Sequence, residues 1–351
     1  MYANLVTPSV LVDLDVAEAN IVRYQSYCDG HNLTLRPHIK THKLPLLAKA
    51  QLDAGAVGIT CQKISEAEAM ISQGGIEDVF ITYNIMGDDK LNRLRSLSQK
   101  VRLSVVADSE MVINGLAEAF ADAQTPLAVL VECDTGARRC GVQQPEQAMA
   151  LAVRIDAASG LKFGGLMTYP PAGATDAVQS WLSRAKALIE AGGIAVPVVS
   201  GGGSPDMWNA HLVPVVTEYR VGTYIYNDRS LVARGTCSLD DCALSVLATI
   251  VSMPTVNRAI IDAGSKVLTS DLLGFEDFGA VLGHPDIRID QLSEEHGRMV
   301  SEQPLDLRVG DRVRIVPNHA CVVSNMLDHV QLIRGSQLVA QSPVLARGKV
   351  W

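Results

Sequence analysis

The sequence predicts an α/β fold, a (β/α)8 barrel of the TIM type followed by a smaller, mainly β domain. Up to about residue 230, eight short apolar runs alternate with helix-like stretches, at intervals of about 20 to 35 residues. After about residue 235 the apolar runs are short and β-rich, and Gly, Pro and Asp separate them. An open doubly wound sheet is the alternative, but we find no Gly-x-Gly-x-x-Gly fingerprint of that fold near the first strand.

Composition narrows the class of protein. The chain has 351 residues, of which 48% are hydrophobic, and carries a net charge of -8. This charge argues against a nucleic-acid partner, since it creates no positive field that would attract phosphates. We find no apolar window long enough for a transmembrane helix, and the start, residues 1–4, has no signal-peptide pattern. The seven cysteines are scattered and odd in number, which indicates reduced thiols in a cytoplasmic protein.

We place the barrel domain at residues 1–235 and the β domain at residues 236–351. The first strand, at about residues 8–15, precedes the eight barrel strands and packs near the second domain in this scheme. Asp15 is expected to cap a helix over residues 16–28, and Asp108 to cap one over residues 109–123. The expected barrel strands are 33–40, 57–61, 79–83, 102–107, 127–133, 163–169, 196–200 and 220–226.

The most unusual segment is Arg36-Pro37-His38-Ile39-Lys40-Thr41-His42-Lys43, at the end of the first barrel strand. Side chains alternate along a strand, so Arg36, His38 and Lys40 are expected to share one face. Near the carboxyl end of a barrel, a partly desolvated Lys40 beside other cations would have a lowered pKa and supply a nucleophilic amine. Lys40 and His38 are therefore the candidate catalytic residues. A solvated basic turn is the alternative.

A glycine cluster, Ser200-Gly201-Gly202-Gly203-Ser204, follows the seventh barrel strand. Three glycines allow backbone amides to approach a ligand, and barrels often bind phosphate after strands seven and eight. Gly222, Thr223 and Tyr224 lie at the eighth strand and could supply further donors. The alternative is an ordinary turn.

In the β domain, Asn318-His319-Ala320-Cys321 places a histidine and a cysteine two residues apart. On a strand both side chains would point the same way and could bind a borderline ion such as zinc. Two ligands leave positions open for water or substrate, as in a catalytic site. A buried histidine beside a buried thiol is the alternative. The hairpin expected at residues 305–315 belongs to the same domain.

Three polar residues follow other barrel strands. Gln62 follows the second, Arg139 follows the fifth, and Tyr169 ends the sixth. Each of them, taken singly, could be structural. Their place after strands puts them at the barrel face where catalytic residues gather.

Taken together, these segments resemble the fold-type III pyridoxal-phosphate enzymes, specifically the D-threonine aldolase and D-serine dehydratase group. The resemblance runs nearly end to end and depends on the order and spacing of the motifs. They are Thr7-Pro8-Ser9, residues 36–43, residues 61–67, Arg139-Cys140-Gly141-Val142, Gly201–Gly203, Asp262-Ala263-Gly264, Glu295-His296-Gly297 and residues 317–321.

The resemblance implies that Lys40, rather than Lys43, bonds covalently to pyridoxal 5′-phosphate. It implies that Gly201, Gly202, Gly203, Gly222 and Thr223 bind the cofactor phosphate, and that Arg139 and Tyr169 line the cofactor; Gln62 and Tyr224 are counted with them. His319 and Cys321 would hold a divalent metal next to the substrate's β-hydroxyl. Members of the group are often homodimers, so we expect a homodimer with the active site at the subunit interface.

The implied activity is a lyase reaction on β-hydroxy-D-amino acids. Within the family, dehydratases resemble a His-x-Cys pattern and aldolases a His-x-Asp pattern, so His319-Ala320-Cys321 favours a D-serine or 3-hydroxy-D-amino acid dehydratase that yields a 2-oxo acid and ammonia. Retro-aldol cleavage of the D-threonine aldolase type, to glycine and an aldehyde, is the alternative. A thiolate ligand favours zinc, with manganese as the alternative. One departure is Tyr169-Pro170-Pro171, where family members carry a histidine close behind the tyrosine.

Two other readings of the same fold type stay open. An amino acid racemase needs a tyrosine base from the β domain, but the last tyrosine of the chain is Tyr226. A pyridoxal-phosphate carrier protein lacks a β domain with a metal pair, and the long segment after residue 235 argues against it.

Overall fold

The computed structural model describes residue 2 and residues 4–351. Met1 and Ala3, in the segment where we expected no signal peptide, lie outside the described residues. By internal contacts the chain divides into two units. The barrel unit comprises Tyr24–Lys40, Pro45–Gly222 and Lys349–Trp351, and the β unit comprises the N-terminal segment to Arg23, Thr41–Leu44 and Thr223–Gly348. The domain boundary at residues 235 and 236 stays a prediction; contacts group residues 223–235 with the β unit.

The barrel unit contains an eight-stranded parallel sheet in the order β2-β9-β8-β7-β6-β5-β4-β3. A parallel bridge between His38 and Thr60 joins the two ends of this order and closes the barrel. The predicted (β/α)8 fold is therefore confirmed. The strands are β2 (Thr34–Leu35), β3 (Ile59–Cys61), β4 (Asp78–Ile81), β5 (Arg102–Ala107), β6 (Leu127–Cys133), β7 (Leu161–Thr168), β8 (Val199–Gly201) and β9 (Glu218–Tyr219).

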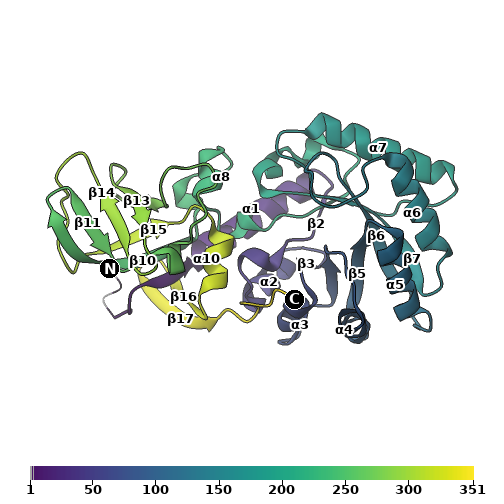
Figure 1. Ribbon diagram of the computed structural model, residues 1–351, viewed down its shortest axis with the longest axis horizontal. Coiled ribbons are helices and arrows are strands. Elements are labelled where there is room, and N and C mark those ends of the chain that lie inside the picture. The colour runs from purple at the N-terminus through teal and green to yellow at the C-terminus, as the bar shows by residue number, and fades with distance from the viewer. Residues whose placement is uncertain (1, 3) are drawn as a thin grey trace. The chain divides into compact units, whose positions relative to one another are not determined.

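Helices follow the strands along the chain, and Figure 1 shows α4 to α7 outside the barrel strands. Their inward faces carry buried apolar residues, as in α5, where Val112, Ile113, Leu116 and Phe120 are buried. The helices of the described barrel unit are the second half of α1 (Leu14–Gly30), α2 (Pro45–Asp53), α3 (Ile64–Ile71), α4 (Asp88–Ser98), α5 (Glu110–Phe120), α6 (Pro145–Ala157) and α7 (Thr175–Ala191), with 3-10 turns η1 (Ile39–Thr41) and η2 (Ser204–Leu212).

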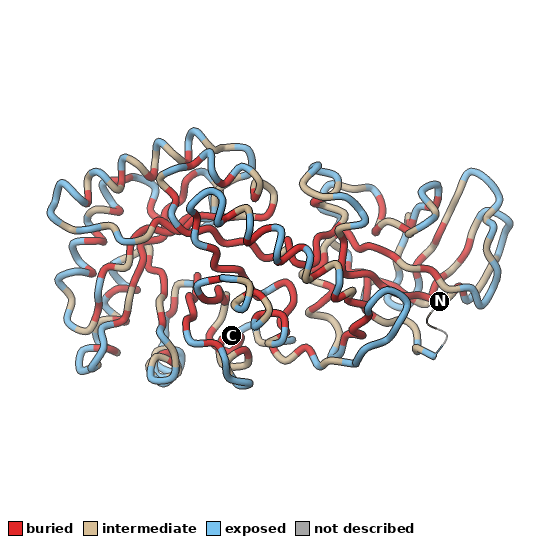
Figure 2. The backbone as a smooth tube through the Cα atoms, turned by 180° about the vertical axis from the view of Figure 1, so that it is seen from behind, coloured by how far each residue is buried: buried red, intermediate tan, exposed pale blue. Residues whose placement is uncertain are grey.

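Barrel strands are buried on both sides, since helices cover one face and the barrel interior the other. All four residues of β4 are buried, and six of the seven residues of β6. Figure 2 shows this as red segments along the strands, with exposed blue segments on the outer helices. Phe80, Val106, Leu130 and Met167 form one packed cluster of four neighbouring strands. This explains why these strands read as continuous apolar runs in the sequence.

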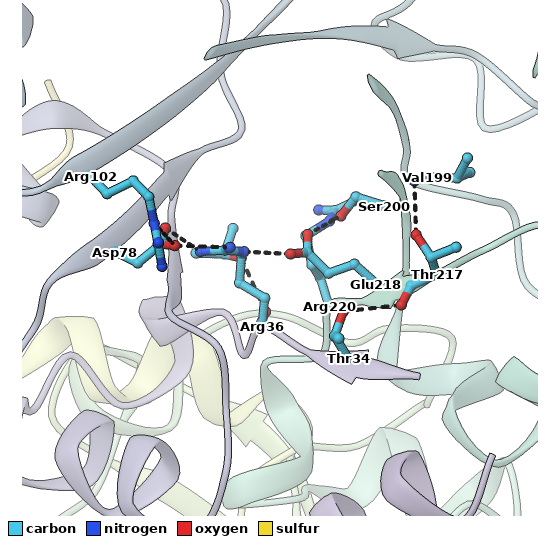
Figure 3. A network of polar contacts seen from close by, with 10 residues as sticks. Thr34, Arg36, Asp78, Arg102, Val199, Ser200, Thr217, Glu218 and Arg220 are labelled. Carbon is cyan, nitrogen blue, oxygen red and sulfur yellow. Dashed lines mark hydrogen bonds and ion pairs between the residues drawn. The ribbon is translucent and has the colours of Figure 1, made fainter. Parts of the chain in front are cut away.

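A buried polar network crosses the barrel (Figure 3). The Arg36 guanidinium donates from Nε to Glu218 at 2.6 Å and from an Nη atom to Asp78 at 2.7 Å. Asp78 also accepts from Arg102 Nε at 2.6 Å, at the rim of the barrel. Glu218 accepts from Ser200 Oγ at 2.6 Å, and Ser200 Oγ accepts from Arg220 Nε at 2.9 Å. The network therefore ties the strands at the closure of the barrel to β4, β8 and β9.

The β unit is built on a nine-stranded sheet in which β1 (Ser9–Asp13) pairs antiparallel with β10 and parallel with β16. Leu11, Leu247 and Ile333, one from each of these strands, form a buried cluster. The unit's other elements are β10 (Leu244–Thr255), β11 (Arg258–Ile261), β12 (Ala280–Val281), β13 (Arg288–Leu292), β14 (Gly297–Val300), β15 (Arg312–Val316), β16 (His329–Arg334) and β17 (Gln337–Pro343), helices α8 (Arg229–Ala233), α9 (Ser265–Leu268) and α10 (Ala320–Met326), and turns η3 (Thr223–Ile225) and η4 (Leu239–Asp241).

Several local expectations are wrong. Residues 305–315 do not form a hairpin: 305–309 are not a strand, and β15 pairs with β10 and β12 instead. The first helix begins at Leu14, and Asp13 rather than Asp15 accepts from the first-turn amides. Ser109 occupies the N-cap expected for Asp108. Within the described part of the chain, no helix is both long and apolar enough to span a membrane.

Gly58 allows the charge network to form, because a Cβ at this position would lie 2.4 Å from an Nη atom of Arg36 and 2.8 Å from the carbonyl oxygen of Asp78. We predict that Gly58→Ala lowers the free energy of unfolding by about 1–3 kcal/mol, the usual cost of overpacking. The measurement is urea unfolding followed by circular dichroism. Gly30→Ala is the matched control, since nothing lies within 4 Å of its added Cβ. Equal stability of the two variants would contradict the prediction.

Candidate active site

Lys40 lies in the 3-10 turn η1, directly after the first barrel strand. Backbone hydrogen bonds continue past β2, from the amide of Arg36 to Tyr219 O and from the amide of His38 to Val221 O. The turn then replaces the strand, so the expected common face of Arg36, His38 and Lys40 does not extend to Lys40. The expectation that Lys40 is partly desolvated is also wrong, since this residue is exposed.

His38 is buried and holds the backbone of this turn. Its Nδ1 accepts from the amide of Lys40 at 3.2 Å, so Nε2 carries the proton and donates to Gln62 Oε1 at 3.1 Å. The Gln62 amide is oriented in turn by its donation to Thr82 O at 2.7 Å. The structure thus brings three predicted site residues together, His38, Lys40 and Gln62. Both ring nitrogens of His38 have partners, so this side chain holds the backbone of Lys40 and the side chain of Gln62 in place.

Lys43 differs from Lys40 in its surroundings. Lys43 belongs to the β unit, is buried, and donates from Nζ to Asn325 Oδ1 at 2.8 Å. Its amine is therefore part of a structural contact, whereas the amine of Lys40 is exposed. This difference distinguishes two lysines that the sequence places three residues apart.

The glycine turn follows β8 in the barrel unit. At Gly202, where φ is +146°, a Cβ would lie 2.1 Å from the carbonyl oxygen of Arg220, so the position excludes any side chain. At Gly201 an added Cβ would lie 3.1 Å from Val216. Gly203 is half-buried, and its added Cβ would lie 3.7 Å from the ring of Tyr169. The turn is therefore packed closely against the Arg220 backbone at Gly202 and against Val216 at Gly201.

Arg139 and Tyr169 lie together in the barrel unit. The Arg139 guanidinium carbon is 4.6 Å from the centre of the Tyr169 ring, a cation-π contact. Both side chains are exposed, and Tyr169 is the residue that the glycine turn approaches. The structure therefore brings Arg139, Tyr169 and Gly203 into one cluster.

Two buried charged residues of the barrel, Arg220 and Glu132, were not predicted from the sequence as candidate site residues. Arg220 is buried and donates to Ser200 Oγ and to Thr168 O, the latter at 2.6 Å; burial lowers the pKa of its guanidinium to about 10. Glu132 is the next-to-last residue of β6 and lies 4.0 Å from Arg139; burial raises its pKa to about 7 against the opposing effect of Arg139. The signal was present, since charges inside apolar strands are costly unless they are paired.

The remaining cofactor residues divide between the units. Gly222 is buried at the end of the barrel unit, whereas Thr223 and Tyr224 belong to the β unit in turn η3. Thr223 Oγ1 lies 3.5 Å from Cys321 Sγ. Tyr224 as a whole residue is only 1% exposed, so the structure gives no support to its predicted role as a cofactor contact.

His319 and Cys321 lie in the β unit, but not on a strand as expected. His319 is the N-cap of α10, and Cys321 is the second residue of this helix. Burial lowers the pKa of His319, but hydrogen bonding to Cys321 and Asp271 outweighs burial and raises the pKa to about 9. The two side chains nevertheless contact one another, so the ligand pair forms by a helix start instead of strand alternation.

The residues present fit the two groups that the sequence implies. Exposed Lys40 offers an amine, and the Gly201–Gly203 turn, in which Gly202 has no space for a side chain, offers backbone amides for a phosphate. In the β unit, an imidazole nitrogen and a thiol in contact form the mixed donor pair that suits zinc.

Comparisons with known proteins agree with this division. The model of the alanine racemase N-terminal domain matches residues 12–230, and the model of a putative serine dehydratase domain matches residues 243–333. The chain is 32% identical to a D-threonine aldolase of Arthrobacter sp., over 99% of this chain and 94% of that protein.

Solved structures extend the similarity to the whole fold. The D-threonine aldolase from Filomicrobium marinum superposes with a TM-score of 0.90 and 33% identity, covering 100% of this chain and 98% of that one. A metal-free cysteine-to-alanine mutant of D-threo-3-hydroxyaspartate dehydratase has a TM-score of 0.85 and 28% identity, covering 97% of each chain. The resemblance inferred from the sequence is confirmed: the chain belongs to the fold-type III pyridoxal-phosphate family of D-threonine aldolases and D-serine dehydratases, with an alanine racemase-type N-terminal domain.

Proposed function

We propose that this protein is a pyridoxal-phosphate- and metal-dependent lyase that dehydrates 3-hydroxy-D-amino acids such as D-serine, with release of ammonia and a 2-oxo acid. The observation that carries the proposal is the contact between His319 and Cys321 at the start of α10, because it offers a nitrogen and a sulfur donor to one cation. In the dehydratase relative, replacing a cysteine by alanine accompanies a metal-free form. By analogy, Cys321 is a metal ligand here.

The cofactor would be held by residues of the barrel unit and the turn that follows it. Lys40 supplies the amine for the covalent bond, because Lys43 is buried against Asn325. The backbone amides of Gly201, Gly202 and Gly203 bind the phosphate, with Gly222 and Thr223 as further donors. Gln62, Arg139, Tyr169 and Tyr224 would line the remaining cofactor surface.

The chain's residues then have separable tasks. Bound pyridoxal phosphate supplies an electron sink for charge that develops at the substrate's α carbon. The amine of Lys40 removes the α proton as a general base. His38 holds the backbone of the Lys40 turn through the 3.2 Å hydrogen bond to its amide, so we assign His38 a positioning role. Arg139, fixed between Glu132 and the Tyr169 ring, offers a cation to an anionic group.

The metal pair favours elimination of water. His319 and Cys321 would hold a cation that would supply Lewis-acid chemistry to the β-hydroxyl and so favour its loss as a leaving group. A thiolate ligand favours zinc over manganese, because manganese prefers oxygen ligands. We therefore propose zinc as the metal.

Retro-aldol cleavage to glycine and an aldehyde is the second candidate. It is favoured by similarity over almost the whole chain to D-threonine aldolases, in sequence and in structure. The same metal would then lower the pKa of the β-hydroxyl, and the bond between the α and β carbons would break. The two reactions share every proposed residue, so only the products distinguish them.

Two further properties belong to the proposal. We propose a homodimer, as the resemblance implies, and a cytoplasmic location. The location is supported by the cysteines, none of which forms a disulfide among the described residues.

A product assay tests the proposed function. The purified protein, loaded with pyridoxal phosphate and with zinc or manganese in separate samples, is mixed with D-serine or D-threonine. Dehydration of D-serine yields pyruvate and ammonia, and of D-threonine 2-oxobutyrate and ammonia, whereas aldol cleavage of D-threonine yields glycine and acetaldehyde. We predict dehydration, and loss of at least 90% of turnover after chelation while the cofactor remains bound. Aldehyde without ammonia would support the second candidate, and full activity without metal would remove the metal from the proposal.

We predict that Lys40→Ala abolishes the visible absorbance of the lysine-bound cofactor and the label trapped by borohydride. Lys43→Met, which keeps the length of the buried side chain, retains both, because Lys43 is expected to serve only the contact with Asn325. Absorbance spectra and peptide mapping after reduction provide the measurement. A label found on Lys43 would overturn the assignment of Lys40.

The raised pKa of Glu132 predicts a pH effect on stability. Because this pKa is about 7 in the fold and near 4.5 ordinarily, the contribution of Glu132 is fully present below pH 4.5 and is lost as pH rises through 7. Glu132→Gln removes that loss. The difference in unfolding free energy between this variant and the native protein should therefore shift in favour of the variant by about 1–3 kcal/mol from pH 5 to pH 8. Urea unfolding at both pH values gives the comparison. Glu118→Gln, at an exposed position, should follow the native protein; an identical pH dependence of all three contradicts the prediction.

A further inference from the structure

Asp271 contacts the proposed metal ligand His319. Its Oδ2 lies 2.7 Å from His319 Nδ1. A carboxylate only accepts hydrogen bonds, so Nδ1 carries the proton. In a neutral imidazole Nε2 is then the ring nitrogen that keeps a lone pair. Nε2 of His319 and Sγ of Cys321 are therefore the two donor atoms that would hold a cation.

The backbone of Asp271 is fastened to the residue that precedes His319. Asn318 is 2% exposed and donates from Nδ2 to the carbonyl oxygens of Asp271, at 3.3 Å, and of Asp277, at 2.7 Å. Its Oδ1 accepts from the amide of Gly279 at 3.0 Å. The loop that carries Asp271 is therefore built against the same short segment as His319. This common support keeps the carboxylate and the imidazole in a fixed relation.

The start of α10 is held independently of Asp271. The carboxylate of Asp228, which is fully buried, accepts from the amide of Ala320 at 3.0 Å. Cys321, the other proposed metal ligand, has its Sγ 3.0 Å from Thr41 Oγ1. Removal of the Asp271 side chain should therefore leave the helix start and Cys321 in place. Its effect should be confined to the orientation and proton of the His319 ring.

We infer that Asp271 is the positioning residue that makes His319 a metal ligand, by fixing the proton on Nδ1 and leaving Nε2 to bind the cation. The inference rests on the proposed metal site. Carboxylates in this position orient the imidazole and increase its basicity, and losing them typically weakens metal binding 10–100-fold. The sequence alone contained no sign of this role, since Asp271 lies 48 residues before His319.

The test measures metal affinity and not turnover. Cobalt(II) is titrated into the metal-free protein, and absorbance in the near ultraviolet reports the cobalt-thiolate bond of Cys321. Zinc competition with a chromophoric chelator then gives the affinity for zinc. We expect Asp271→Ala to weaken both metals about 10–100-fold. Asp271→Asn, whose amide oxygen can still accept from Nδ1 but carries no charge, should lie between Asp271→Ala and the native protein.

Asp306→Asn is the control, because Asp306 is an exposed carboxylate in another loop of the β unit. The amide of its neighbour Leu305 donates to Val256 O, between β10 and β11. Circular dichroism verifies that each variant is folded. If Asp271→Ala does not fold, Asp271→Asn alone provides the test. Native affinity in the Asp271 variants would overturn the inference, while the metal site would stand. If the native protein and the control show no cobalt-thiolate absorbance, the proposed metal site fails, and the inference with it.

Discussion

The buried guanidinium of Arg36 is the constraint on which the barrel depends. Its strand and the strand that begins at Ile59 are the two ends of the barrel order, and few main-chain hydrogen bonds join them. Arg36 connects this closure to Asp78 on one side and to Glu218 on the other. Charges buried this deeply are tolerated only when they are paired and hydrogen-bonded on all sides. The network therefore specifies which strands meet, and a single unpaired member would be costly.

The same strand that closes the barrel also leads to Lys40, the amine that we propose to bind the cofactor. Pro37 lacks an amide proton, and His38 makes the last backbone bond of the strand before the chain turns at Ile39. The ring of His38 then accepts from the amide of Lys40 and contacts Gln62, which directly follows the next strand. Lys40 is thus placed by groups that never need to touch a substrate. Structural and chemical tasks are divided between neighbouring residues of one short segment.

Much of the fold could be predicted, because strands buried on both faces leave a plain apolar signal; Arg102–Ala107 and Leu127–Cys133 have the predicted bounds. The site was harder to predict. Lys40 could be selected because it lies in an unusual motif. Strand alternation predicted the wrong position for its side chain, because the sequence does not reveal that the strand ends in a 3-10 turn. His319 and Cys321 are paired by a helix start. Glu132 and Arg220 were visible as charges in apolar segments, but the partners of Arg220 and Asp271 are distant in sequence, and no local pattern encodes them.

The close approach of Gly202 to the carbonyl oxygen of Arg220 has a consequence for loading of the apoprotein. The loop cannot shift without moving Arg220, whose guanidinium is bonded to Ser200 and to the Thr168 carbonyl. Its shape is therefore fixed during folding, and the conformational entropy of ordering it is not lost again on association. If this turn binds the cofactor phosphate as proposed, a newly made chain would present it already ordered, and binding of the vitamin should be limited by encounter and bond formation instead of by loop rearrangement.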